Sequence, residues 1–288
     1  CEMVFFLVRN DPPNDILDNL LLFFVFFILI YFTIERDKET NIIHLNNIIH
    51  INVLIMFFIS PPFGNYINLP DTISIAGSFT LHERKGLISQ IFKTLYYSFE
   101  LNGWVNKIGL RNKGIDWALK NVDSSHIISI AILQPNEINK LLKKIPKNRN
   151  IEINISCPNV DHDMVSNGVS KFLNNQRKWC ILKVSPNTTN EEIKHYYNQG
   201  FRQFHCCNTI PIKNGGLSGK SLVPYTNEKI EYIKNNLPYS VIIAGGGITN
   251  INDVRAYKIK GAQHFSASTV FFNPFAAMML YTQYKLEK

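Results

Sequence analysis

The sequence predicts an α/β protein built as a (β/α)8 TIM barrel, preceded by a hydrophobic N-terminal extension. Two observations support this fold class. From about residue 73 onward, short apolar runs alternate with helical patterns, and the alternation recurs eight times. The runs are almost continuously apolar, which is typical of parallel strands that are buried on both faces.

The apolar runs give the eight predicted strands. An open, doubly wound sheet is the alternative arrangement, but no G-x-G-x-x-G motif follows the first strand, which disfavours its dinucleotide-binding form. The predicted strands cover residues 73–76, 90–95, 127–132, 151–155, 180–184, 203–207, 240–244 and 264–267.

Start and stop signals define the helices between these strands. Pro135 begins a helix that ends before Pro146. Thr188 and Thr189 each precede a glutamate by three residues, which is the pattern of a capping box. A helix over residues 252–260 stops at Gly261, and the last helix starts at Pro274.

The first sixty residues differ in kind from the rest. Residues 20–34 read LLLFFVFFILIYFTI, and a helix of this length spans ~22 Å, against a hydrocarbon core of ~30 Å. Extension back to residue 16 nearly reaches the required length. A membrane anchor, a structured lead-in and a non-native or poorly ordered extension are all consistent with this run. We therefore divide the chain into an extension, 1–60, and a barrel domain, 61–288.

Composition narrows the class of protein. The net charge of +8 suits anionic ligands, although the basic residues are scattered. The five cysteines form no CxxC pair and no metal-ligand spacing, so we expect no metal site. An odd number of cysteines without a framework favours a reducing compartment, hence the cytoplasm. Membrane association through residues 16–34 is the alternative.

The most informative segment follows the strand 151–155. Cys157 lies between two carboxamides, those of Asn154 and Asn159. A thiol can exchange a proton near neutral pH, and carboxamides can bind the amide and imide edges of a flat heterocycle. This arrangement predicts chemistry on a pyrimidine-like ring.

Polar and glycine residues follow the other predicted strands, at the barrel face where active sites form. A glycine loop, residues 245–247, after strand seven and Ser268-Thr269 after strand eight predict a phosphate cradle. The residues at strand ends are Ala76, Gly77, Lys93, Thr94, Lys183, Asn208, Thr209, Gly216, Gly246, Gly247, Ser268 and Thr269.

Four segments, in this order, resemble the dihydroorotate dehydrogenase family of FMN-dependent barrels. They are residues 106–114 (NKIGLRNKG), 152–160 (EINISCPNV), 208–219 (NTIPIKNGGLSG) and 242–248 (IIAGGGI). The resemblance runs from about residue 73 to 274. It implies the oxidation of dihydroorotate to orotate in de novo pyrimidine (UMP) biosynthesis.

The resemblance also implies roles for individual residues. Cys157 matches the catalytic base of the soluble, cysteine-using branch, and Lys183 matches a lysine at the flavin ring. The residues matched to substrate binding are Asn106, Ile108, Gly109, Leu110, Asn154, Asn159, Asn208 and Thr209. Those matched to FMN binding are Ala76, Gly77, Lys93, Thr94, Lys183, Gly216, Gly246, Gly247, Ser268 and Thr269.

Several alternatives stay open at this point. The stretches 93–106 and 159–183 are shorter than in the family, so another dihydropyrimidine- or dihydrouridine-type substrate is an alternative. A non-catalytic, metabolite-binding barrel is another. Dihydrouridine synthases carry a helical RNA-binding domain after the barrel, whereas few residues follow Thr269 here, so we expect no nucleic-acid partner.

The electron acceptor is not identified by these motifs. The cysteine motif favours the fumarate-type branch. The apolar run at 16–34 resembles the membrane-associated, quinone-using branch, which has serine in place of Cys157, and a partner iron–sulfur flavoprotein is a third option. Soluble relatives are usually dimers, so a homodimer is expected.

Overall fold

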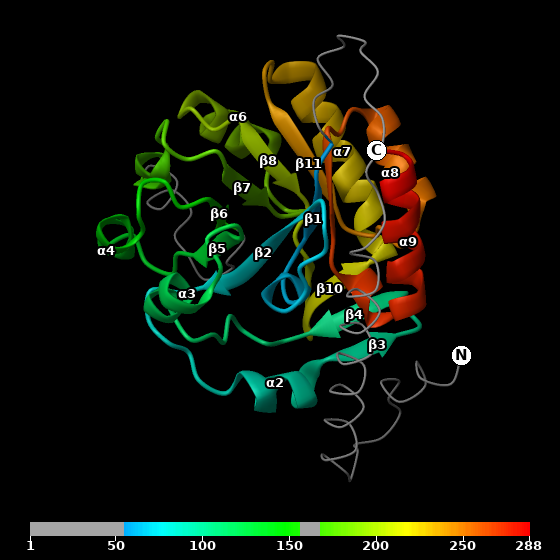
Figure 1. The fold of residues 1–288 in the computed structure, drawn as a ribbon, viewed down its shortest axis with the longest axis horizontal. Coiled ribbons are helices and arrows are strands. Elements are labelled where there is room, and N and C mark those ends of the chain that lie inside the picture. The colour runs from blue at the N-terminus through cyan, green and yellow to red at the C-terminus, as the bar shows by residue number, and fades with distance from the viewer. Residues whose placement is uncertain (1–54, 156–167) are drawn as a thin grey trace. The chain divides into compact units, whose positions relative to one another are not determined.

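The computed structural model describes residues 55–155 and 168–288. Eight parallel strands form a closed barrel in the order β1-β12-β11-β8-β7-β6-β5-β2 (Figure 1). The closed ring confirms the predicted TIM barrel and excludes the open sheet. The barrel strands are β1 (Phe57–Ile59), β2 (Thr72–Phe79), β5 (Ile127–Ala131), β6 (Ile151–Asn154), β7 (Cys180–Val184), β8 (Gln203–Cys206), β11 (Val241–Gly245) and β12 (His264–Ala267).

The first two strands differ from the prediction. Residues 90–95 were predicted as a strand, and this is wrong, because they belong mostly to helix α2 (Leu87–Thr94). A short apolar run does not distinguish a strand from a helix, and here Leu87, Ile88 and Ile91 recur at helical spacing. Figure 1 shows α2 outside the ring of barrel strands, leading into β3. The first barrel strand is β1, so β2 is the second.

The compact barrel unit starts at Ile55. Strand β1 therefore lies within residues 1–60, the segment that the sequence suggested as an extension. The apolar run at 16–34 lies outside the described residues. Among the residues that the structure describes, no helix is long and apolar enough to span a bilayer.

The helices mostly follow the predicted signals. Thr189 caps α6 (Asn190–Asn198), and its hydroxyl and the Glu192 carboxylate form the predicted capping box. Gly261 ends α8 in the left-handed region, with φ 116°. Besides α2, the described helices are α3 (Ile115–Asn121), α4 (Glu137–Lys144), α6 (Asn190–Asn198), α7 (Val223–Asn236), α8 (Ile251–Lys260) and α9 (Pro274–Leu286). The described 3-10 turns are η3 (Phe63–Asn65), η4 (Ser170–Phe172), η5 (Lys220–Leu222) and η6 (Thr269–Phe272).

A second, antiparallel sheet was not predicted. It contains β3 (Tyr96–Ser98), β4 (Gly103–Asn106), β10 (Gly215–Gly219) and β9 (Ile210–Ile212), in that order. Its glycine-rich strand β10 resembles a loop in sequence. The indole of Trp104 stacks on Phe272 with ring centroids 4.0 Å apart, so the small sheet packs on the turn that follows β12.

The barrel interior consists of an apolar layer and a polar layer. The apolar layer contains Phe58, Ile75, Ile127, Trp179, Ile181 and Ile243. One or two residues further along several strands, the side chains become polar, as with Ser129, Glu152 and Ser266, all of which are fully buried. Because this polar layer lies toward the carboxyl ends of the strands, it underlies the face where barrel active sites form.

Removal of the α6 cap tests the local energetics. We expect Thr189→Ala to lower the free energy of unfolding by about 1 kcal/mol, because the Glu192 N–H loses its acceptor. Urea denaturation measures the change. The control Lys194→Ala, exposed on the same helix, should change it by less than about 0.5 kcal/mol. Equal effects of the two substitutions would show that the cap does not stabilise α6.

Candidate functional site

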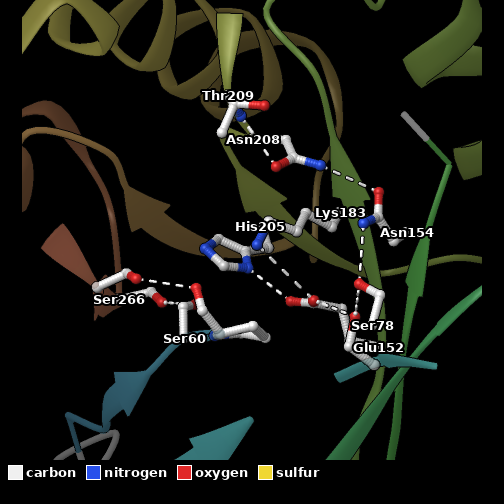
Figure 2. A network of polar contacts seen from close by, with 12 residues as sticks. Ser60, Ser78, Glu152, Asn154, Lys183, His205, Asn208, Thr209 and Ser266 are labelled. Carbon is white, nitrogen blue, oxygen red and sulfur yellow. Dashed lines mark hydrogen bonds and ion pairs between the residues drawn. The ribbon is translucent and has the colours of Figure 1, made fainter. Parts of the chain in front are cut away.

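Three carboxamide and hydroxyl side chains meet at the carboxyl ends of β2, β6 and β8. The Asn154 Nδ2 atom donates to the Ser78 hydroxyl at 3.0 Å, and its Oδ1 accepts from Asn208 Nδ2 at 3.0 Å. The backbone N–H of Thr209 donates to Asn208 Oδ1 at 2.9 Å. Figure 2 shows these side chains converging above the barrel interior. Two of the four asparagines expected to bind substrate, Asn154 and Asn208, are thus in direct contact.

Lys183 lies at the end of β7, beside this amide pair. In the parallel register Lys183 is opposite Asn154 on one side and His205 on the other. Its ammonium nitrogen lies 3.9 Å from the Glu152 carboxylate, and only 10% of its side chain is exposed. A cation is therefore held at the predicted flavin side of the barrel by a buried anion.

Glu152 and His205 form a fully buried pair beneath Lys183. The His205 Nδ1 atom lies 2.7 Å from Glu152 Oε2, and the Ser129 hydroxyl donates to Oε1 at 2.8 Å (Figure 2). A Cβ atom on Gly245 would come within 2.6 Å of the His205 Nε2 atom, so the glycine leaves room for the ring. The carboxylate therefore has a partner on each oxygen.

The electrostatics of this pair favour a charged glutamate and a neutral histidine. Burial alone would raise the pKa of Glu152, but Lys183, His205 and the Ser129 hydroxyl lower it to about 2. Burial and then the Lys183 charge lower the pKa of His205, and these effects oppose Glu152, which raises it. Nδ1 therefore carries the proton and donates it to the carboxylate.

Sequence reasoning did not single out Glu152, His205, Ser78 or Ser129. Glu152 lies within the 152–160 motif, and a lone carboxylate inside an otherwise apolar strand was the available signal. His205 has no informative spacing to other histidines. Its proximity to Glu152 depends on the pairing of β6, β7 and β8, which only the tertiary structure provides.

The segment from Asn106 to Leu110 reaches the site through the small sheet. Asn106 pairs with Gly216, and a Cβ atom on Gly216 would come within 2.7 Å of Thr209 Oγ1. Ile108, Gly109 and Leu110 follow β4 in a loop, where the Leu110 carbonyl accepts from Asn112 Nδ2 at 2.7 Å. The same Asn112 side chain accepts from the Gly114 N–H at 2.8 Å, so Asn112 organises this loop.

Gly246 and Gly247 follow β11 with φ values of 88° and 73°, a region that favours glycine. Added Cβ atoms would come within 2.8 Å of Leu222 and 2.6 Å of Val223, respectively. These glycines bring the loop against the start of α7.

Ser268 and Thr269 follow β12, the neighbour of β11 in the barrel. The Ser268 hydroxyl donates to the Pro61 carbonyl at 2.8 Å, and Thr269 begins η6. The ends of strands seven and eight therefore adjoin, as the predicted phosphate cradle requires.

The remaining predicted site residues lie in β2, on helix α2 or outside the described residues. Ala76 and Gly77 lie in β2, the second barrel strand rather than the first. Lys93 and Thr94 occupy the last turn of α2, where Lys93 is exposed and the Thr94 hydroxyl donates to Gln90 O. They therefore do not lie at the end of a barrel strand, and their role at the flavin, which the family resemblance implies, stays a prediction. Cys157 and Asn159 lie outside the described residues.

The three described cysteines are buried and unpaired with one another. Burial raises the pKa of Cys180 to about 11 and that of Cys207 to about 12, and it also raises the pKa of Cys206 well above its ordinary value. These thiols are therefore protonated packing groups at neutral pH, as expected for cysteines in barrel layers. Within the described residues, no group of three or more metal-ligating side chains could hold a metal ion.

The buried pair predicts a loss of stability in acid. The pKa values of Glu152 and His205 are both depressed by folding, so the stability they confer is present at neutral pH and is lost as pH falls. The loss starts near the ordinary histidine pKa of 6.5 and continues, through Glu152, from 4.5 down to about 2. The Glu152 contribution is about 3 kcal/mol.

Urea unfolding between pH 7 and pH 2.5 measures this dependence. Glu152→Gln should decline less steeply below pH 4.5 than the unmodified protein. Parallel declines for the two proteins would contradict the assignment of a buried, ionised Glu152.

Comparisons with known proteins were made for the whole chain. No protein-family model matches it. Curated relatives named dihydroorotate dehydrogenase B (NAD(+)), catalytic subunit, are similar. The protein of Lachnoclostridium phytofermentans is 26% identical over 211 residues, which cover 61% of this chain and 70% of the relative. That of Oceanobacillus iheyensis is 29% identical over 212 residues, 61% and 69% of the two chains.

A solved structure supports the fold. The crystal structure of DHODH in complex with ferulenol from Eimeria tenella matches with a TM-score of 0.63 and 13% identity, covering 96% of this chain and 92% of that chain. At this identity the match concerns the barrel fold alone. Over 61% of its length, the chain is therefore similar to curated dihydroorotate dehydrogenases, and it shares its barrel fold with the solved structure.

Proposed function

We propose that this protein catalyses the FMN-dependent oxidation of dihydroorotate to orotate, a step of pyrimidine biosynthesis. The observation that carries the proposal is the convergence of Asn154, Lys183 and Asn208 at the ends of three adjacent strands. Two carboxamides in contact, with a cation on the adjacent strand, suit a flat imide ring stacked beside an electron-accepting group. The curated relatives carry the name of this activity.

The described residues fit FMN. Lys183 offers a buried cation beside the proposed ring, and the Gly246-Gly247 loop would present backbone N–H groups to a phosphate next to the end of β12. Gly216, Ser268 and Thr269 complete the candidate set, while Ala76 and Gly77 lie at the end of β2. When bound, FMN would supply the acceptor for the hydride that leaves the substrate.

The chain's own residues would orient the substrate and move the proton. Oxidation forms a carbon–carbon double bond, as one ring carbon loses a hydride and its neighbour loses a proton. Cys157 would take that proton, because a thiolate is accessible near neutral pH after a modest pKa shift. Asn154, Asn159 and Asn208 would hold the ring so that both carbon–hydrogen bonds are correctly directed.

The electron acceptor in the second half of the reaction is a separate question. The names of the curated relatives specify NAD(+) and a catalytic subunit. This wording favours NAD(+), reached through a partner subunit, over the fumarate-type acceptor expected from the cysteine motif. The homodimer and the cytoplasmic location stay predictions.

Anaerobic flavin reduction tests the proposed reaction. We expect the purified protein to be yellow, and dihydroorotate should bleach the flavin. Cys157→Ala should slow bleaching by about 10²–10⁴-fold with unchanged FMN content, because only the proton acceptor is lost. The control Cys180→Ala removes a buried packing thiol and should leave the rate per bound flavin unchanged. A yellow protein that dihydroorotate does not bleach would contradict the substrate, and a colourless protein that cannot be loaded with FMN would contradict the cofactor.

Substitution of Lys183 tests the role of its charge. Lys183→Met should lower the reduction potential of the bound flavin by roughly 30 mV or more, because a nearby cation favours electron uptake. Lys178→Met is the matched control, since Lys178 is an exposed lysine two residues before the start of β7, at the opposite end of the barrel. Equal potentials in the two variants would remove Lys183 from the flavin site.

A further inference from the structure

The polar layer of the barrel and the substrate amides are linked by one continuous chain of hydrogen bonds. The chain runs through Thr209, Asn208, Asn154, Ser78, Ser129 and Glu152 (Figure 2). Each bond is between 2.8 and 3.0 Å long. Its residues come from β2, β5, β6 and the segment after β8, so it crosses the inside of the barrel.

The direction of this chain follows from chemistry at its two ends. An ionised carboxylate can only accept, so the Ser129 hydroxyl must give its single proton to Glu152. Ser129 must then accept from Ser78 at 2.9 Å, and Ser78 in turn must accept. The group that Asn154 presents to Ser78 is therefore its NH2 group.

The Thr209 end of the chain gives the same direction for the hydrogen bonds. The Thr209 backbone N–H can only donate, so Asn208 presents its oxygen to it and its NH2 group to Asn154. The Asn154 oxygen thus faces Asn208, in agreement with the argument from Glu152. Every donor points toward the carboxylate, and no reversed arrangement satisfies both ends.

His205 and Lys183 keep the anchoring carboxylate in one state. His205 occupies the Oε2 atom, which leaves Oε1 for Ser129, and Lys183 supplies a nearby positive charge. Glu152 is completely buried, so without these partners the cost of its charge would favour protonation. A protonated carboxyl could donate to Ser129, and the direction at this end of the chain would then oppose the direction that the Thr209 N–H sets.

We propose that Glu152 is a positioning residue that, through Ser129 and Ser78, holds Asn154 in the orientation that the Thr209 N–H sets from the other end, and so helps to fix which amide atoms of Asn154 and Asn208 face a bound pyrimidine. This inference rests on the proposed function for the identity of the ligand. It assigns Glu152 no contact with substrate. The pattern of amide donors and acceptors, rather than the shape of the site, is what the carboxylate controls.

The binding of orotate, the product of the proposed reaction, to the FMN-loaded protein tests this inference. Ser129→Ala removes the link between Glu152 and Ser78, and we expect the orotate Kd to rise about tenfold, because the Ser78 hydroxyl loses its acceptor and Asn154 is then held from the Thr209 end alone. Ser78→Ala should have a similar effect. The double variant should be no worse than either single variant, because one break already interrupts the chain. The FMN Kd should stay within about twofold.

Ser266→Ala is the matched control. Ser266 is equally buried in the barrel, but its hydroxyl pairs with Ser60 at 2.6 Å rather than with the chain. The Ser266→Ala substitution should leave the orotate Kd within about twofold of that of the unmodified protein. Glu152→Gln keeps the shape but can donate as well as accept, so it should weaken orotate binding about tenfold. Unchanged orotate binding in both Ser129→Ala and Glu152→Gln would overturn the inference.

Failure of the proposed function is separable from failure of this inference. If the unmodified protein binds FMN but not orotate, or neither, the proposed function fails. The chain is then tested by urea unfolding of Ser129→Ala, Asn208→Ala and the double variant, because these two residues are linked through Asn154 and Ser78. A coupling of about fivefold or more in the unfolding constant would support the chain. Additivity within about twofold would overturn it.

Discussion

The site depends on a single buried charge, the Glu152 carboxylate. A carboxylate inside a barrel is costly unless both of its oxygens are bound, and here Ser129 and His205 bind them while Lys183 lies nearby. These partners come from β5, β7 and β8, the strands next to and beyond β6 in the barrel. Closure of the barrel in this strand order is therefore what allows the charge to be buried at all.

The apolar layer and the polar layer of the barrel interior have different roles. Phe58, Trp179 and their apolar neighbours fill the interior below the polar layer and supply hydrophobic stabilisation. The polar layer above them contacts the groups at the carboxyl ends of the strands through Ser129 and Ser78. A ring of packed strands holds such groups more rigidly than loops do, which is the requirement for aligning a ring with two reacting carbon–hydrogen bonds.

Much of the fold could be predicted from local patterns in the sequence. The six barrel strands from β5 onward lie where apolar runs predict them, and Thr189 and Gly261 bound their helices as their capping chemistry requires. The error at residues 90–95 arose because six residues are too few to separate a strand from an amphipathic helix. The small sheet was missed because β10 is mostly glycine, and its strand character depends on pairing with β4.

The sequence by itself determined the barrel class and the positions of Asn154, Lys183 and Asn208 at or just after strand ends, because apolar runs and side-chain chemistry are local properties. Only the tertiary structure decided that β1 is the first strand, that Lys93 lies on a helix, and that Glu152 and His205 meet. Residues 53 positions apart become partners through strand register, and register is a property of the closed sheet. For the same reason, the direction of the hydrogen-bond chain could be derived only after its two ends were placed.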